Sequence, residues 1–326
     1  MSKSLGNGIV PADIVNEYGA DILRLWVASS DYHADIRISK DILKQLSEAY
    51  RKIRNTARYI LGNLYDFDPN KDCVALDQLQ PIDQWALYQL DVLNKKVREG
   101  YDTFEFHQVY HAIHNFCVVD MSNFYLDVIK DRLYADKADS QSRRAAQTAI
   151  YMILDAMTRM IAPILAYTSD EIWGFMPHSE KEDPSCVLYN EMPACTGVQV
   201  DDAFISRWDR IHALRDDVQK ALELARKEKK IGKSLEAKVE LYCQGDLYDF
   251  VKAVEQELKT VFIVSEVEVL NAGQGDYQGE TEGFSVSVKH AHGEKCVRCW
   301  VYSDTVGQDA DHPQLCRRCA KVIKGE

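Results

Sequence analysis

Four cysteines near the C-terminus constrain this chain more than any other feature. They form two C-x-x-C pairs, Cys296 with Cys299 and Cys316 with Cys319, separated by sixteen residues. Two thiolates from each pair can meet at one tetrahedral Zn²⁺, and four thiolates leave no position open for a bound water. Sulfur ligands in fours suit zinc or an iron–sulfur centre better than a hard cation. We therefore expect one structural zinc ion, in a small C-terminal module whose folding depends on the metal.

The other five cysteines lie singly in the sequence and are expected to be ordinary thiols: Cys73, Cys117, Cys186, Cys195 and Cys243. The N-terminus has no basic stretch leading into an apolar run, so no signal peptide is expected. No segment reaches the roughly 18 apolar residues that a membrane span needs. We expect no membrane partner and a cytoplasmic location, where disulfides are rare.

The length of 326 residues suits two or three domains, each with its own core. Apolar residues make up 46% of the chain, which indicates a globular protein rather than a disordered one. The net charge of −12 argues against non-specific binding to a polyanion, unless basic residues gather locally.

The first half of the chain shows the periodicity of helices. Apolar residues recur every three or four positions, as on one face of an amphipathic helix. Four long antiparallel helices joined by short connections would form a bundle. Pro163 predicts a kink or an early end of the last helix. The expected helices span 14–29, 39–64, 83–99, 104–129 and 142–167.

Beyond a connector over 177–197, helices and strands alternate. Helices are expected over 203–229 and 247–258, and strands over 237–243, near 267–269 and over 284–288. The Gly-rich stretch before the last strand indicates a turn or flexible loop. The fold class we expect is therefore mainly α: a helix bundle, then a small α/β domain, then a zinc-binding module with four cysteine ligands.

Two stretches of the sequence are basic, although the chain as a whole carries a net negative charge. In the C-terminal module, arginines surround Trp300, and positive charge beside an exposed aromatic ring suits the stacking of unpaired RNA bases. Alternatively, Trp300 packs against the cysteine knuckle and the charges are simply solvated. The second stretch ends a helix, where cations are favoured whatever the function. The candidate RNA-binding residues are Arg298, Trp300, Arg317 and Arg318 in the module and Arg226, Lys227, Lys229, Lys230 and Lys233 in the second stretch.

The N-terminal sequence M-S-K-S-L-G-N-G places Lys3 between Ser2 and Ser4 in a polar loop. Such a loop can bend around a phosphate, with the ammonium group as a movable point charge. It is equally typical of a disordered terminus. The adjacent carboxylates Asp216 and Asp217 diverge on a helix, so we expect a solvated face rather than a catalytic pair.

The order of several segments resembles the C-terminal part of class I aminoacyl-tRNA synthetases, and among them the bacterial isoleucyl-tRNA synthetases. Met1–Ser4 resembles the last four residues of the K-M-S-K-S signature. The resemblance covers essentially the whole chain through YGADILRLWVASSDY, YRKIRNTARYILGNLYDFDP, EFHQVYHAIHNFCVVDMSNFYLDVIKDRLY, IAPILAYTSDEIW, KCVRCW and CRRC.

The resemblance implies that Lys3 stabilises the ATP phosphates during activation of isoleucine, with Ser2 and Ser4 shaping the loop. It implies four parts: the end of the catalytic domain (1–37), an anticodon-binding helical bundle (38–197), a small α/β domain (198–289) and a zinc-binding module (290–326). The implied partner is the tRNA for isoleucine. Isoleucine, and ATP with Mg²⁺, would bind only in the full enzyme. We expect a monomer.

Two departures from the family matter. The sequence contains no H-I-G-H signature, and it has no nucleotide-binding half or editing domain. We therefore expect that the chain does not aminoacylate tRNA by itself. The alternative hypothesis is a zinc-stabilised helical scaffold that binds protein partners through its bundle, because helix bundles serve many functions.

Overall fold

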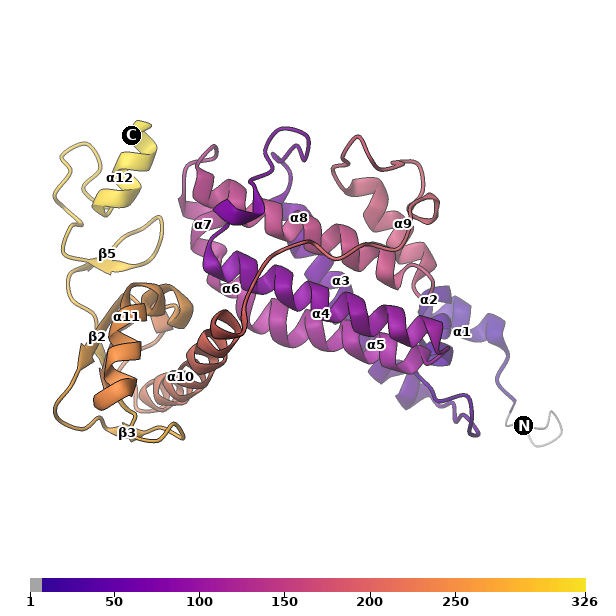
Figure 1. Cartoon of the computed structure of the whole chain (residues 1–326), viewed down its shortest axis with the longest axis horizontal. Helices are drawn as coiled ribbons and strands as arrows, with labels where there is room; N and C mark the ends of the chain where they lie inside the picture. The colour runs from indigo at the N-terminus through magenta and orange to yellow at the C-terminus, as the bar shows by residue number, and fades with distance from the viewer. Residues whose placement is uncertain (1–7) are drawn as a thin grey trace. The chain divides into compact units, whose positions relative to one another are not determined.

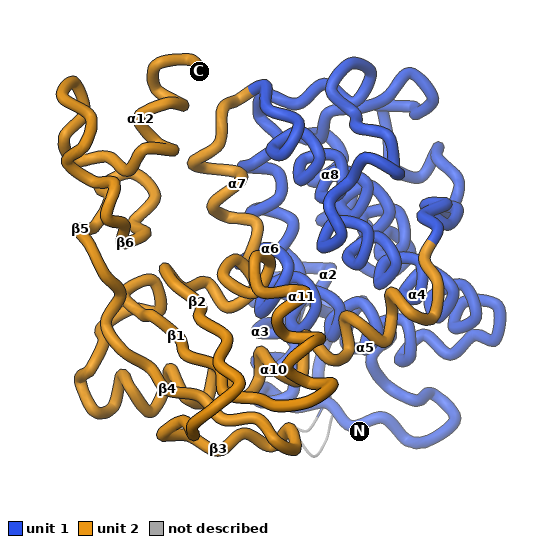
Figure 2. Tube along the Cα trace, turned by 60° about the vertical axis from the view of Figure 1, so that its left-hand side comes forward, with its two compact units in different colours: residues 1–127, 139–199 blue, residues 128–138, 200–326 orange. Residues whose placement is uncertain are grey.

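The computed structural model describes residues 8–326 and divides the chain into two compact units (Figure 2). Unit 1 comprises residues 1–127 and 139–199, and unit 2 comprises residues 128–138 and 200–326. Ser2, Lys3 and Ser4 lie outside the described residues. Within residues 8–326, no helix is both long and apolar enough to cross a membrane.

Unit 1 begins with two short helices where the sequence predicted one over 14–29. Helix α1 (Pro11–Tyr18) carries its proline in the first turn, and α2 (Ala20–Ala28) follows after a single residue. That residue is Gly19, whose φ of 91° ends α1, since residues with a side chain rarely adopt this conformation.

Three long helices and one shorter helix form the bundle, and the predicted bundle is confirmed (Figure 1). They are α3 (Lys40–Asn63), α4 (Pro81–Asp102), α5 (Phe106–Asn115) and α8 (Gln141–Ile161). Serine caps begin two of them: Ser39 accepts a hydrogen bond from the amide of Ile42, and Ser140 from that of Arg143, both at 3.2 Å. Helix α4 contacts both α5 and α8, and the apolar stripes between them form the core of the unit.

The helix predicted over 104–129 is not regular. After α5 the backbone continues as a π-helix (Phe116–Tyr125) and then as the short α6 (Leu126–Val128). Helix α7 (Lys130–Ala135) follows and belongs to unit 2. Periodicity alone could not show the wider turns, because every third or fourth residue still faces the core.

Pro163 ends the last helix of the bundle early, as predicted. Helix α8 stops at Ile161, and α9 (Ala166–Phe175) begins after the proline. Two polar side chains of α2 stabilise this break. Arg24 donates to the carbonyls of Pro163 and Ile164 at 2.6 and 2.8 Å, and Asp21 accepts from the amide of Thr168 at 2.8 Å. The break thereby gains partners for backbone groups that a proline leaves unpaired.

Unit 2 contains a four-stranded sheet and two long helices. The elements are α10 (Asp202–Lys227), β1 (Ala237–Tyr242), α11 (Gly245–Phe262), β2 (Glu266–Leu270), β3 (Tyr277–Gln278) and β4 (Ser285–His290). The strand order is β2-β1-β4-β3, with β1 parallel to β2 and antiparallel to β4. Strand β3 lies in the Gly-rich stretch that the sequence predicted as a loop. Single 3₁₀ turns span Leu76–Gln78 and Val187–Tyr189 in unit 1 and Ser234–Glu236 in unit 2.

The two faces of this sheet differ in character. Residues paired across β1 and β4, such as Val239 with Val288 and Leu241 with Val286, are buried apolar side chains. Helix α10 contacts β4, α11 contacts β2, and the two helices contact each other, so they cover this face together. The opposite face carries ion pairs, among them Lys238 with Glu268 at 2.6 Å.

Asp217 corrects one sequence-based expectation. Its side chain is only 1% exposed and accepts hydrogen bonds from the amides of Glu280 and Thr281 at 2.7 and 3.0 Å. It therefore anchors the loop between β3 and β4 and does not form a solvated face with Asp216. A Cβ at Gly279 would lie 2.6 Å from the Asp217 carboxylate, which explains why glycine stands there.

Asp120, on the π-helix, makes the stability of unit 1 depend on pH. Burial raises its pKa from 3.8 to about 6, and Lys96 opposes the shift only partly. The folded-state pKa lies above the unfolded value, so protonation of Asp120 favours the folded state. This contribution to the free energy of unfolding is fully present below about pH 4 and is lost as the pH rises through 6. Relative to Asp120→Asn, the free energy of unfolding of the native chain should fall by about 1–2 kcal/mol between pH 4 and 6.

Urea unfolding followed by circular dichroism at pH 4, 5, 6 and 7.5 measures this difference. We expect the difference in free energy of unfolding between the native chain and Asp120→Asn to change up to about pH 6 and to stay constant above it. Asp216→Asn, on a helix of unit 2, is the matched control. A gap that is the same at all four pH values would contradict the assignment.

Candidate metal centre and nucleic-acid surface

The two cysteine pairs lie on two different local structures. Strands β5 (Glu294–Lys295) and β6 (Tyr302–Ser303) form a hairpin around the first pair, where the Cys296 carbonyl accepts from the amide of Trp300 at 2.9 Å. The second pair begins α12 (Arg317–Lys324), with Cys316 as its N-cap and Cys319 in its first turn. The sequence predicted the two C-x-x-C pairs but neither the hairpin nor α12.

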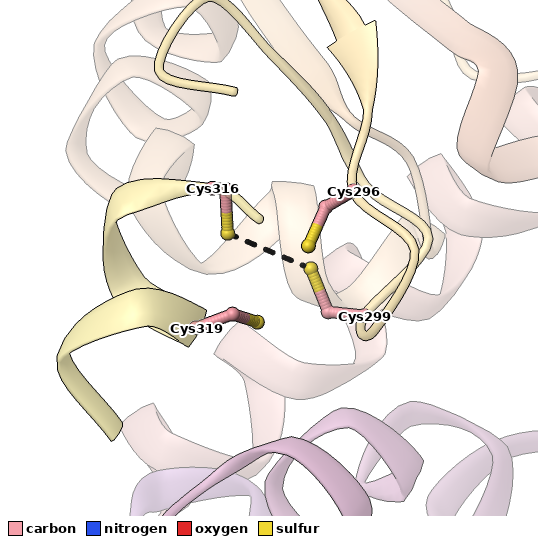
Figure 3. Close-up of side chains that lie close together, drawn as sticks. All are labelled: Cys296, Cys299, Cys316 and Cys319. Atoms are coloured by element: carbon pink, nitrogen blue, oxygen red, sulfur yellow. Dashed lines mark hydrogen bonds between the residues drawn. The ribbon is translucent and has the colours of Figure 1, made fainter. Parts of the chain in front are cut away.

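The four sulfur atoms point toward one another (Figure 3). All lie within 4.8 Å of each other, and the distance from Cys299 Sγ to Cys316 Sγ is 3.8 Å. Four sulfurs bound to zinc at about 2.3 Å form a tetrahedron with edges of about 3.8 Å, whereas a disulfide requires about 2.05 Å. The donor set therefore fits one tetrahedral zinc ion. Among the described residues, this is the only group of three or more His, Cys, Asp or Glu side chains close enough to hold a metal.

The thiols occupy most of the interior of the module. Its buried cluster consists of Cys296, Leu315, Cys316, Cys319 and Ala320, with Cys299 and Val306 packed against it. Three of the five buried side chains are thus cysteines. Without a metal the module has little apolar surface to bury, so metal binding must supply much of its folding free energy.

Hydrogen bonds at the cluster shift the pKa values of Cys319 and Cys299 in opposite directions. A hydrogen bond from the Cys299 thiol lowers the pKa of Cys319, and the Arg298 guanidinium, whose Nη1 lies 3.7 Å from Cys319 Sγ, acts in the same direction. The same contact with Cys319 raises the pKa of Cys299. A thiolate therefore forms readily at Cys319, and metal ligation requires thiolates.

The module is hydrogen-bonded to the sheet domain of the same unit. Ser265 Oγ accepts from the amide of Tyr302 at 2.8 Å and donates to the carbonyl of Leu235 at 2.5 Å. The ring nitrogen of His292 lies 2.8 Å from the Glu266 carboxylate, so this histidine faces the sheet rather than the metal. Gly293 permits the turn into the hairpin, since a Cβ there would lie 2.3 Å from the backbone of Ser303.

Trp300 lies at the surface and is surrounded by positive charge. Its side chain is 54% exposed, and the Nζ atoms of Lys233 and Lys295 lie 5.3 and 5.6 Å from its ring centroid. The structure thus brings together one residue from each of the two basic stretches. We call Lys233, Lys295 and Trp300 the Trp300 patch. Sequence reasoning missed Lys295, although it lies directly beside the first cysteine of the motif.

The other predicted basic residues differ in their surroundings. Arg298 and Arg318 contact the α7 segment, Ala135 and Asp131 respectively. Arg317 donates to Gln308 at 2.9 Å. In the second stretch, Arg226 donates to Ser234 at 3.0 Å, Lys227 lies 3.8 Å from Glu223 and Lys230 lies 2.9 Å from Glu228. Lys229 is an exposed residue with a φ of 61°. Their roles in RNA binding stay predictions.

Removal of one thiol should abolish the centre while leaving the bundle intact. Cys316→Ser removes a ligand and keeps a residue that is favourable at the N-cap of α12. We therefore expect less than about one tenth of a zinc ion per chain, against one in the native protein. Hydrogen exchange over 293–322 should rise, while helical circular dichroism stays nearly unchanged. Cys195→Ser, at an exposed thiol, is the control. Full zinc content in Cys316→Ser, or none in the native chain, would contradict the assignment.

Three family models match the chain in sequence order. Residues 1–39 match "tRNA synthetases class I (I, L, M and V)", residues 83–241 match "Anticodon-binding domain of tRNA ligase", and residues 293–322 match "Zinc finger found in FPG and IleRS". The third match contains all four cysteines, in agreement with one structural Zn²⁺ at the cluster.

Relatives named isoleucine–tRNA ligase align with the whole chain. The sequence is 50% identical to that of Caldanaerobacter subterraneus over 328 residues, 50% identical to that of Moorella thermoacetica over 329, and 48% identical to that of Geobacter sulfurreducens over 326. Each alignment covers 99% of this chain and 35% of the relative, so the chain spans about a third of their length. It belongs to the isoleucine–tRNA ligase family and corresponds to the C-terminal portion of its members.

Proposed function

We propose that this chain is the tRNA-binding part of an isoleucine–tRNA ligase and that the Trp300 patch contacts the RNA. The observation that carries the proposal is an exposed indole beside two lysine ammonium groups, on a module held by four cysteines. An unpaired base can stack on the indole while the lysines interact with its phosphates. The match of residues 83–241 to an anticodon-binding domain supports the same partner.

The backbone at Trp300 supports a functional role for its side chain. Trp300 has a φ of 65°, a left-handed conformation that costs a residue with a Cβ roughly 1–2 kcal/mol and costs glycine almost nothing. The ring is 54% exposed, so burial recovers only part of this cost. A strained, exposed tryptophan in a position that suits glycine is better explained by binding than by packing.

The proposal includes the expected division of the chain: the end of a catalytic domain over 1–37, an anticodon-binding bundle over 38–197, an α/β domain over 198–289 and a zinc module over 290–326. Lys3 would interact with the ATP phosphates, with Ser2 and Ser4 shaping its loop. The class I synthetase model matches only residues 1–39, so we expect no aminoacylation by this chain alone. We place its action in the cytoplasm and expect a monomer.

Trp300→Gly separates binding from stability. Glycine relieves the left-handed backbone, so zinc retention should be equal to or better than in the native chain. Loss of one stacking platform should weaken binding to tRNA for isoleucine by about 10-fold or more. Gel-shift titration and zinc release to a chelator measure the two effects.

Two variants control this experiment. Trp300→Phe keeps an aromatic face and should retain most of the affinity, and Val297→Ala changes another exposed side chain of the same hairpin without affecting binding. Unchanged affinity in Trp300→Gly would refute the role of the indole. Native binding no tighter than to an unrelated RNA duplex at low salt would refute tRNA recognition and favour a scaffold for protein partners.

The lysines of the patch should act through phosphate. Lys233→Gln together with Lys295→Gln should reduce the slope of log affinity against log salt by about 1.4–1.8, since each phosphate contact contributes about 0.7–0.9. Lys252→Gln is the matched control, because this lysine is paired with Glu255 at 2.8 Å and is not among the candidate RNA contacts. Equal slopes in the double variant and the native chain would show that neither lysine contacts phosphate.

A further inference from the structure

Segment 128–138, which carries α7, has an unusual place in the chain. It is grouped with unit 2, although the residues on both of its sides belong to unit 1. Three residues of the zinc module and its C-terminal end contact this segment: Arg298, Arg318 and Gly325. The contacts of the two arginines differ in their relation to the metal centre.

Arg298 contacts the segment and the metal centre with one nitrogen. Its Nη1 donates to the carbonyl of Ala135, at the C-terminal end of α7, and lies 3.7 Å from Cys319 Sγ. A guanidinium nitrogen carries two hydrogens, so one can be directed at the carbonyl and the other at the sulfur. Four thiolates around one zinc ion carry a net charge of about −2, and a cation that donates to one of them reduces that charge locally.

Arg318 forms a second contact, which depends on zinc indirectly. Its guanidinium pairs with both carboxylate oxygens of Asp131, with Nη2 to Oδ1 at 2.6 Å. Arg318 lies on α12, a helix of eight residues that contains Cys319 and is capped by Cys316. A helix this short is unstable alone in water, so the two bonds from its cysteines to the metal hold Arg318 in place.

We propose that Arg298 couples the zinc centre to the α7 segment: its guanidinium joins the zinc-bound thiolate of Cys319 to the carbonyl of Ala135. Loss of the metal frees Arg298 and unfolds α12, and both contacts with α7 are lost together. Conversely, a fixed α7 segment holds Arg298 against the thiolate and slows release of the metal. Arg298 is therefore a positioning residue rather than a ligand, and the inference rests on the zinc site, not on the proposed contact with RNA.

Hydrogen exchange over 128–138 tests the first half of the proposal. In the zinc-loaded native chain the amides of α7 should be protected, and removal of zinc by a chelator should raise their exchange about 10-fold, along with that of 293–322. Re-addition of zinc should restore the protection. Equal exchange over 128–138 with and without zinc would overturn the proposal.

Three variants distinguish coupling between the zinc centre and α7 from a purely structural role of Arg298. Arg298→Met keeps the aliphatic stem but removes the guanidinium and with it both hydrogen bonds, to Ala135 and to Cys319. We expect faster exchange over 128–138 and zinc release about 10- to 100-fold faster than in the native chain. Asp131→Asn weakens only the Arg318 contact, so it should loosen the segment and speed zinc release by less than Arg298→Met does. Arg317→Met, on α12 but paired with Gln308, should change neither.

A spectroscopic readout covers the case in which Arg298→Met binds zinc poorly. With cobalt(II) in place of zinc, the thiolate-to-metal charge-transfer band should shift in Arg298→Met and not in Arg317→Met, because only Arg298 donates to a ligand sulfur. Unchanged zinc release together with an unshifted band in Arg298→Met would show that Arg298 does not act on the metal centre, and would refute the proposed coupling to α7.

Discussion

The meeting of four thiolates at one point is the interaction on which the C-terminal structure depends. Five buried side chains form the interior of the module, and three of them are metal ligands. So small an apolar core cannot offset the conformational entropy of some thirty residues. Bonds from zinc to both cysteine pairs hold the β5–β6 hairpin against α12, and Ser265 then joins this hairpin to the sheet domain.

The zinc centre has no open position, so its contribution to function is the surface that it shapes. The first cysteine pair forces a tight turn that ends at Trp300, and the left-handed backbone there directs the indole outward. Lys295 precedes the same pair, and Lys233 comes from the loop after α10, so the Trp300 patch combines two regions far apart in the sequence. Positive charge is therefore concentrated at the indole even though the whole chain carries a net charge of −12.

The sequence predicted features that follow from local spacing. The meeting of the two C-x-x-C pairs, the helices over 39–64 and 83–99 and the early end at Pro163 are confirmed, since each depends on periodicity or on a single residue type. Features that depend on distant partners were missed. The π-helix keeps an apolar pattern like that of an α-helix, β3 forms only because β4 lies beside it, and Asp217 is buried by the loop that it anchors. The contacts of Arg298 and Arg318 with α7 join residues 163 and 187 positions apart, so no spacing rule could reveal them.

We propose that the surface that binds tRNA forms only when zinc holds the β5–β6 hairpin and α12 together. The most direct test is the affinity for tRNA for isoleucine of one preparation, measured zinc-loaded, after removal of zinc by a chelator, and after zinc is restored, with helical circular dichroism recorded in each state. We expect affinity to fall at least about 10-fold without zinc and to return with it, while the helices persist. Equal affinity in all three states would contradict it.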